Sequence, residues 1–207
     1  MEERRQNNVL VLFAHPAIRG SRVNRRLVDA VRDLAGVTVN DLYEAYPDLD
    51  IDVAREQDLL ERHEIVVMQH PFFWYSTPAI LKEWQDLVLE HGWAYGHEGH
   101  ALEGKILLSA LSSGGSEEAY CEQGSNRMTI RQLLAPIERT ARLCGMEYLP
   151  PFVVYGTHGL SGEELAGSAA DYRRLVEALR DGALDVQAVR DLPRINHDLD
   201  SVLRPVG

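Results

Sequence analysis

The sequence predicts an α/β fold in which a doubly wound, five-stranded parallel sheet is covered by helices on both faces, giving three layers. Apolar runs of strand length alternate along the chain with segments of helical periodicity, and this alternation is typical of βαβ units. The runs are apolar at consecutive positions, as in strands buried on both faces. We expect the strand order 2-1-3-4-5, with ligands binding at the carboxyl ends of the strands.

The strands are predicted from short apolar runs that end at turn or proline residues. The first run, Val9–Ala14, ends at His15-Pro16, where proline removes a backbone donor. The third is halted in the same way by Pro71. We assign the second, third, fourth and fifth strands to Val37–Leu42, Ile65–Met68, Ile106–Leu111 and Phe152–Tyr155.

The helices are predicted from apolar stripes with a period of 3.6 and from their end signals. Ser21 can cap a helix that stops at Gly36, and Ser76 or Thr77 can cap one with Pro78 in its first turn. Two more stripes predict a helix that ends at Gly145 and a final one that ends near Leu179. A modest helix is expected over Val53–Arg62.

The length of 207 residues suits a single domain, which we place at residues 1–180. Residues 181–207 have weak periodicity and are interrupted by Pro193 and Pro205, so we interpret them as a C-terminal tail with no assigned role.

Composition excludes several classes of function. The formal net charge of −11 disfavours nucleic-acid binding, which needs clustered Lys and Arg, and direct attachment to anionic lipid. No apolar run approaches the ~18 residues of a membrane span, and no basic stretch followed by an apolar run begins the chain. Cys121 and Cys144 lack a C-x-x-C spacing and suit a reducing compartment. We therefore expect a cytoplasmic protein.

The loop after the first strand is a candidate phosphate site. His15, Ser21 and Asn24 lie where a helix opens, so a hydroxyl, an amide and backbone N–H groups can hold a phosphate there. The alternative is that Ser21 only caps its helix and His15 only packs near a strand end. Neither a Walker lysine nor a G-x-G-x-x-G fingerprint is present, which argues against nucleotide hydrolysis and a standard Rossmann dehydrogenase.

The loop after the third strand contains four successive aromatics, Phe72-Phe73-Trp74-Tyr75. They cannot all face one core, so some should line a flat cavity suited to an aromatic ring system, although a core plug with an apolar rim is the alternative. The glycines of Ser112-Ser113-Gly114-Gly115 can bring backbone N–H donors close to such a ring, but alone they are a weak signal.

These loops occur in the order found in a known family. The longest matching stretch is Gln69-His70-Pro71-Phe72-Phe73-Trp74-Tyr75-Ser76-Thr77-Pro78, which continues through Leu81-Lys82, Trp84 and Asp86 to His91-Gly92-Trp93-Ala94-Tyr95-Gly96. Ala14-His15-Pro16, Leu102-Glu103-Gly104-Lys105 and Leu149-Pro150-Pro151-Phe152 extend it. From about Val9 to Leu179 the chain resembles the flavodoxin-like NAD(P)H:quinone reductases, and most closely the ancillary flavoproteins of Kef-type potassium efflux systems.

The resemblance implies a flavin, FMN more readily than FAD, that takes hydride from NAD(P)H and, after the donor leaves, reduces a quinone. It assigns the flavin phosphate to His15, Ser21, Arg22, Val23 and Asn24. It places the isoalloxazine ring among Phe72, Phe73, Trp74, Tyr75, Ser112, Ser113, Gly114 and Gly115.

The resemblance also gives roles to three further aromatics. Tyr120 matches a family tyrosine beside the flavin edge, and Asn126 stands where the family often has its histidine partner, so we expect Tyr120 to act electrostatically. The family site is completed across a homodimer, in which Trp93 and Tyr95 correspond to the partner's aromatic lid over the substrate.

Alternative roles are considered for three histidines and one cysteine. His91, His97 and His100 lie in a glycine-rich segment without cysteine or helical spacing, so we expect no metal there. Cys121 beside Tyr120 is a redox sensor or, more commonly, a neutral packed thiol.

Three functions are compatible with these features, and we place them in order. The first is two-electron reduction of quinones or related electrophiles. The second is a regulatory subunit that activates a glutathione-gated potassium/proton antiporter at the inner membrane, through a protein contact. A one-electron carrier of flavodoxin type is third, because its hydroxyl-rich phosphate loop is absent.

Overall fold

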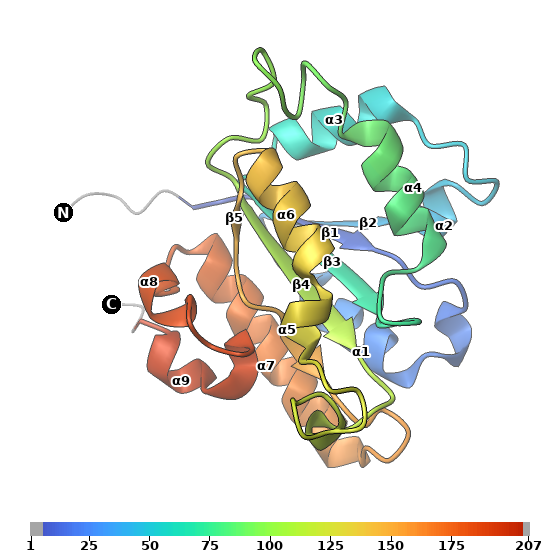
Figure 1. The fold of residues 1–207 in the computed structure, drawn as a ribbon, viewed down its shortest axis with the longest axis vertical. Coiled ribbons are helices and arrows are strands. Elements are labelled where there is room, and N and C mark those ends of the chain that lie inside the picture. Colours follow the sequence, from blue (N-terminus) through green and yellow to red (C-terminus); the bar gives the residue numbers. More distant parts are fainter. Residues whose placement is uncertain (1–5, 205–207) are drawn as a thin grey trace.

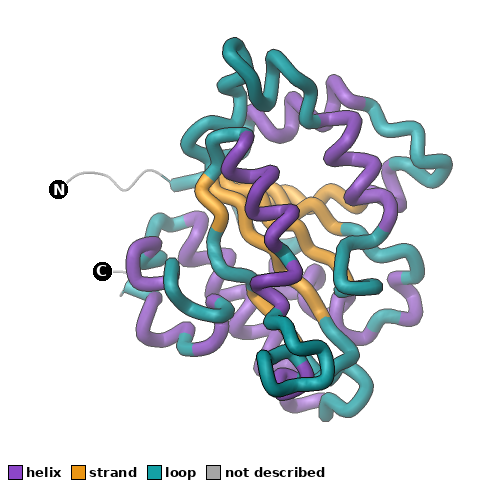
Figure 2. The backbone as a smooth tube through the Cα atoms, in the orientation of Figure 1, coloured by secondary structure: helices purple, strands orange, loops and turns teal. Residues whose placement is uncertain are grey.

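The computed structural model describes residues 6–204 and gives a parallel sheet between two layers of helices (Figures 1 and 2). The strand order is β2-β1-β3-β4-β5, with β6 also pairing with β4, so the doubly wound fold and the order 2-1-3-4-5 are confirmed. The strands are β1 (Val9–Phe13), β2 (Val37–Asp41), β3 (Ile65–Pro71), β4 (Ile106–Ser112), β5 (Glu147–Tyr148) and β6 (Phe152–Val154).

The predicted fifth strand, Phe152–Tyr155, corresponds to β6, and this edge of the sheet also contains β5, a short strand that was not predicted. Residues Ile106 and Leu107 of β4 pair with β5, and residues 110–112 of β4 pair with β6. Between them lie Pro150 and Pro151, which have no N–H to donate to a ladder. The edge of the sheet therefore consists of two short strands, because the two consecutive prolines interrupt the pairing with β4.

Within residues 6–204, the main helices divide between the two faces of the sheet. Helices α1 (Arg22–Val31) and α7 (Gly162–Arg180) pack on alternate residues of β1, whereas α3 (Val53–Glu61), α4 (Ala79–Val88), α5 (Ile130–Leu133) and α6 (Ala135–Leu143) pack on the residues between them. The short helix α2 (Leu42–Ala45) follows β2. Within residues 6–204, no helix is long and apolar enough to cross a membrane.

The helix ends agree with most of the predicted signals. The Ser21 hydroxyl accepts from the backbone N–H of Asn24 and caps α1, and Gly145 follows α6 with a positive φ of 72°. The predicted cap of α4 is wrong, because Pro78 is its N-cap residue and no side chain caps it. The helix expected to end at Gly145 is divided at Leu134, with Pro136 in the first turn of α6.

The segment after α7 has more structure than its weak periodicity predicts. It forms α8 (Val186–Val189), the 3₁₀ turn η3 (Ile195–His197) and α9 (Leu199–Val202), and residues 205–207 lie outside the described residues. The weak periodicity has a physical cause, since each short element contributes only one or two apolar side chains to the core. These side chains join the cluster beneath α1 and α7: Leu184, Val189, Ile195, Leu199 and Val202.

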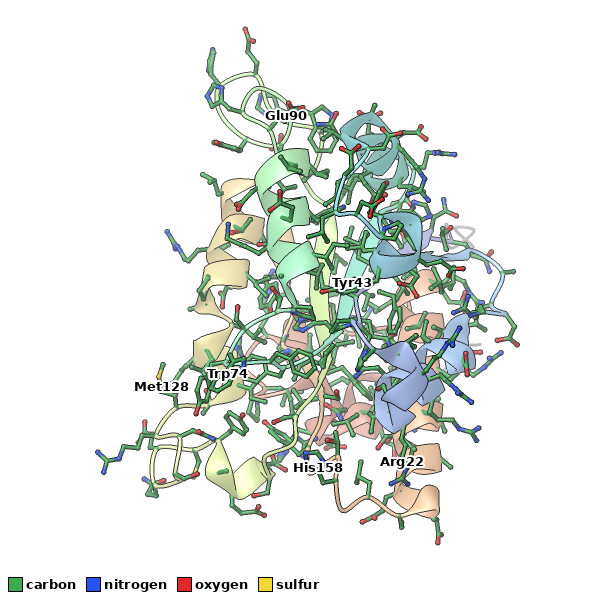
Figure 3. All side chains as sticks on the ribbon, turned by 90° about the vertical axis from the view of Figure 1, so that its right-hand side faces the viewer. Arg22, Tyr43, Trp74, Glu90, Met128 and His158 are labelled. Carbon is green, nitrogen blue, oxygen red and sulfur yellow. The ribbon has the colours of Figure 1, made fainter. Side chains whose placement is uncertain are left out.

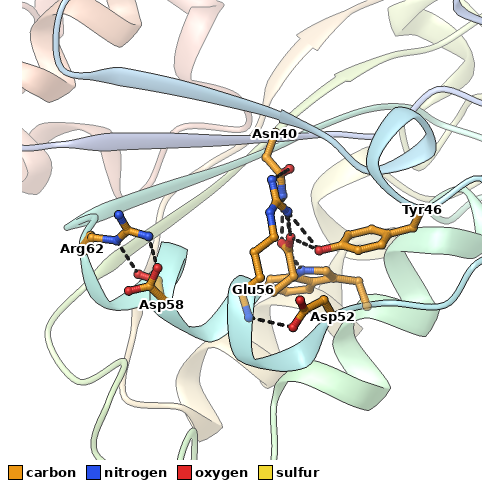
Figure 4. A network of polar contacts seen from close by, with 8 residues as sticks. Asn40, Tyr46, Asp52, Glu56, Asp58 and Arg62 are labelled. Atoms are coloured by element: carbon orange, nitrogen blue, oxygen red, sulfur yellow. Dashed lines mark hydrogen bonds and ion pairs between the residues drawn. The ribbon is translucent and has the colours of Figure 1, made fainter.

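A buried carboxylate ties α3 to the sheet (Figure 4). The Glu56 side chain is fully buried and accepts hydrogen bonds from Asn40 of β2 at 2.8 Å and from the Tyr46 hydroxyl at 2.6 Å. The indole N–H of Trp84 in α4 donates to it at 2.9 Å, and Arg55 forms its ion pair at 2.5 Å. A charge without water is tolerated here because donors surround it.

His70 of β3 is a fully buried histidine that we expect to destabilise the fold in acid. Its Nδ1–H donates to the carbonyl of Pro71 at 3.0 Å, and its Nε2 has no partner within the described residues. Burial lowers the pKa of His70 from 6.5 to about 4. As the pH falls below about 6.5, the unfolded chain binds a proton before the folded chain does, so the free energy of unfolding decreases until about pH 4.

At pH 5 this linkage amounts to about 2 kcal/mol. Urea unfolding at pH 7 and pH 5 should show His70→Gln losing about 2 kcal/mol less than the wild type between the two. His97→Gln changes an exposed histidine and should keep the wild-type difference. If His70→Gln and the wild type lost the same free energy of unfolding between pH 7 and pH 5, His70 would not be the source of the acid sensitivity.

Candidate active site

A cleft opens at the carboxyl ends of the strands, where the fold predicts a ligand. Its volume is about 480 Å³, within the usual range for small-molecule sites. The loops after β1, β3, β4 and β6 contribute to it. Its lining consists of His15, Gly20, Ser21, Arg22, Val23, Asn24, Pro71, Phe72, Phe73, Ser112, Gly114, Thr157 and His158.

One end of the cleft is built to hold an anion. Ser21 and Asn24 lie at the N-terminus of α1, where backbone N–H groups and the helix dipole favour negative charge. A second hollow of about 310 Å³ shares this end. Four arginines and a single acid, Asp29, line that hollow together with uncharged residues, so this end is positive in a chain of net charge −11. The arginines are Arg19, Arg22, Arg25 and Arg26.

His15 presents a neutral imidazole to the same cleft. Its Nδ1 accepts from the backbone N–H of Ala17 at 3.1 Å, so the proton of the neutral ring lies on Nε2. Partial burial lowers the pKa of His15. His15 therefore offers an N–H donor without adding a charge.

The floor of the cleft contains an unsatisfied polar atom. Asn24 is 1% exposed, its amide donates to the Ser112 hydroxyl at 2.8 Å, and its Oδ1 has no partner within the described residues. Gln69 beneath it donates to the Asn24 carbonyl at 2.9 Å. Asn24 as a residue lines the cleft, and this oxygen is buried beneath the cleft surface.

The aromatic end is formed by Phe72 and Phe73, and the two following residues form its rim. Trp74 and Tyr75 have positive φ angles of 49° and 63°, and Phe73 and Ser76 exchange backbone hydrogen bonds of 2.9 and 3.1 Å around them. This is the geometry of a two-residue hairpin turn, which Gly or Asn usually occupies, so two bulky residues here are strained. Strain that holds aromatic side chains at the mouth of a cleft indicates a functional role.

The loop after β4 forms a narrow wall of the cleft. A Cβ atom on Gly114 would lie 2.9 Å from His158 Nε2, and one on Gly115 would lie 2.8 Å from the Tyr120 ring. Tyr120 is half-buried, with its ring 6.0 Å from that of Phe72. Asn126 accepts a hydrogen bond from the Tyr75 hydroxyl at 3.1 Å. Because both positions are glycine, the side chains of His158 and Tyr120 can pack directly against the backbone of this loop.

The structure brings together nine of the predicted site residues and leaves seven outside the lining. The nine are His15, Ser21, Arg22, Val23, Asn24, Phe72, Phe73, Ser112 and Gly114. Trp74, which is 90% exposed, and Tyr75 are at the rim. Ser113, Gly115 and Tyr120 are also outside the lining, and a Cβ atom on Gly115 would lie 2.8 Å from the Tyr120 ring.

Trp93 and Tyr95 lie far from the cleft of their own chain. They follow α4, at the end of the sheet marked by Glu90, whereas Trp74, His158 and Arg22 lie at the opposite end (Figure 3). The Trp93 indole donates to Glu61 of α3 at 3.0 Å, and the Tyr95 ring packs against His91.

Thr157 and His158 are lining residues that the sequence analysis missed. They follow β6, and the rule that ligands bind at carboxyl ends of strands applies to that strand as well as to the others. The signal was therefore present in the position of the fifth predicted strand.

Comparisons with known proteins agree with this geometry. The chain is 46% identical over 166 residues to the glutathione-regulated potassium-efflux system ancillary protein KefF of Enterobacter sp. (strain 638), covering 80% of this chain and 93% of KefF. The crystal structure of general stress protein 14 from Treponema denticola in complex with FMN is 40% identical, with a TM-score of 0.80, and covers 83% of this chain and 99% of that one.

A third relative is the NADPH-quinone reductase structure from P. pentosaceus, which is 30% identical with a TM-score of 0.75 and covers 81% of this chain and 96% of that one. The model of the family described as having a flavodoxin-like fold matches residues 7–176. This chain therefore belongs to the flavodoxin-like fold family.

Proposed function

We propose that this chain is an FMN-dependent NAD(P)H:quinone oxidoreductase. The observation that carries the proposal is the cleft itself, which is positive and donor-rich at the α1 end and aromatic at the other. Those ends fit the phosphate and the ring of FMN. The FMN complex and the quinone reductase among the similar structures support the same conclusion.

Each group of residues has a stated task in this proposal. Ser21, Arg22, Val23 and Asn24 hold the phosphate with the neutral N–H of His15, while Phe72 to Tyr75 and Ser112 to Gly115 bound the ring. When bound, FMN accepts hydride from NAD(P)H and then passes both electrons to a quinone. Tyr120 contributes electrostatically beside Phe72, because Asn126 is engaged by Tyr75.

The test is an absorbance spectrum of the purified protein, followed by anaerobic NAD(P)H and then a quinone. We expect a yellow protein that bleaches with the donor and recovers with the acceptor. A colourless protein that FMN and FAD both fail to reconstitute would overturn the proposal.

Trp74→Ala is a sharper probe of where the ring lies. Trp74 is 90% exposed, so its removal leaves the core intact, but it takes an aromatic surface from the rim. We expect the dissociation constant for FMN to rise about tenfold with little change in the free energy of unfolding. Leu49→Ala, a change at an exposed apolar residue outside both the cleft and the groove beside α4 and α6, is the control. Flavin titration by fluorescence quenching measures both, and an unchanged affinity in Trp74→Ala would count against this ring position.

A homodimer is proposed to complete the site. Trp93 bonds Glu61 of α3, and neither Trp93 nor Tyr95 lines the cleft of its own chain, so we place them over the cleft of a second copy. Tyr95 lines a groove of about 350 Å³ that also contains residues of α4 and α6, and Leu87 and Leu143 on those helices are exposed. Light scattering should give twice the chain mass, and a monomer that turns over quinone at full rate would contradict the dimeric site.

Regulation of a potassium efflux antiporter is a second candidate, favoured by the 46% identity to KefF. The protein would then be cytoplasmic and reach the inner membrane through its partner. Co-purification with a Kef-type antiporter and a change in potassium flux test it, and the absence of both would exclude it.

A further inference from the structure

We propose that Arg194, beyond the matched residues 7–176, is a positioning residue that holds the loop of Tyr120 against the cleft. The proposal rests on the proposed function, because Tyr120 matters only if the cleft holds the flavin. The proposal gives the segment after α7 a role, which is to support the loop of Tyr120.

Arg194 contacts the loop through a bidentate ion pair with Glu117. Its Nε and NH2 groups donate to the two carboxylate oxygens of Glu117 at 3.1 and 2.9 Å. Glu117 begins the 3₁₀ turn η2 (Glu117–Ala119), and its carbonyl accepts the backbone N–H of Tyr120 at 3.0 Å. The Arg194 side chain is only 17% exposed, whereas that of Glu117 is 50% exposed, so the guanidinium is the shielded partner and the bidentate geometry strengthens the pair.

The same guanidinium also supports a line of aromatic rings that ends in the cleft. Its Cζ lies 5.9 Å from the centre of the Tyr155 ring, which follows β6. The Tyr155 ring is 6.1 Å from Tyr120, and Tyr120 is 6.0 Å from the cleft residue Phe72. Arg194 is therefore connected to Tyr120 both through Glu117 and through Tyr155.

Arg194 can position other groups because its own segment is fixed. Its NH1 donates to the Asn196 carbonyl at 2.6 Å, and the Asn196 side chain bonds both the N–H and the carbonyl of Val153, at 3.0 and 2.9 Å. Ile195 between them is buried, and its N–H donates to the Pro151 carbonyl at 2.9 Å. Asn196 thus occupies the open edge of β6, where a further strand would pair.

Arg194→Gln tests the proposal, with Arg194→Lys as the conservative variant and Arg174→Gln as the matched control. Arg174 also joins the C-terminal segment to the body, through Asp200 and Asp171, but it is 45% exposed and remote from the cleft lining. The first readout is amide hydrogen exchange of the flavin-free protein over residues 113–120. The second is the dissociation constant for FMN.

In Arg194→Gln we expect exchange over residues 113–120 to accelerate about tenfold while α7 keeps its protection. The lost pair with Glu117 is at η2, and the other lost bond, to the Asn196 carbonyl, is within the segment of Arg194 itself. FMN affinity should fall several-fold, Arg194→Lys should recover part of both effects, and Arg174→Gln should leave both unchanged. Acceleration spread over the whole chain, or none at η2, would overturn the positioning role. Failure of the wild type to bind flavin would refute the proposed function instead, and the exchange result would still decide the role of Arg194.

Discussion

Ser21→Asp should raise the dissociation constant for FMN by about 100-fold or more while leaving the fold intact. Aspartate caps a helix as well as serine does, so the bond from the Asn24 N–H is kept and the negative charge favours the helix N-terminus. The same carboxylate would lie against the flavin phosphate. Coulomb's law gives a repulsion of about 8 kcal/mol for a carboxylate about 4 Å from a dianion at an effective dielectric constant of about 20, and less than half of this accounts for a loss of affinity of about 100-fold.

The matched control is Ser161→Asp. Ser161 caps α7 with the same geometry, accepting from the N–H of Glu164, but it is exposed and outside the cleft lining. Thermal unfolding of the flavin-free proteins should be close to wild type for both variants, and fluorescence titration should show weakened FMN binding for Ser21→Asp alone. Equal FMN affinity in the two variants would place the phosphate elsewhere.

Glu56→Ala should lower the free energy of unfolding by about 3–5 kcal/mol, the range for removing one partner of a buried ion pair. The loss leaves the Trp84 N–H, the Asn40 amide and the Tyr46 hydroxyl without their acceptor in a region closed to water (Figure 4). Urea unfolding of the flavin-free protein measures the change. Because the network lies outside the cleft lining, FMN affinity of the folded variant should be unaffected.

Asp58→Ala is the control on the same helix. Asp58 is 59% exposed and pairs with Arg62 one turn further along α3, so its removal should change the free energy of unfolding by at most about 0.5 kcal/mol. A similar loss in both variants would show that helix α3 is sensitive to any charge removal, and would refute the specific role of the buried carboxylate.

The sheet was predictable because its strands are short, apolar runs with clear ends. Val9–Phe13 and Ile65–Pro71 are buried along their whole length, and burial on both faces removes the need for alternation. The interruption of the edge strand was less predictable, since pairing of Glu147 and Tyr148 depends on β4 rather than on a local pattern.

The candidate site was predictable at its α1 end and less so at its wall. Ser21 and Asn24 follow a strand and open a helix, which is a local signal. The contacts of Gly114 with His158 and of Gly115 with Tyr120 join segments distant in sequence, and no local pattern carries such a contact.

The sequence by itself determined the doubly wound fold, the order of its strands and the end of the sheet at which a ligand binds, because apolar periodicity and turn residues act over a few positions. Only the tertiary structure decided that Trp93 contacts Glu61 and Tyr95 contacts His91 rather than their own cleft, and that Arg194 reaches Glu117. Those placements depend on long-range packing, since side chains some 77 residues apart meet only after the sheet has formed.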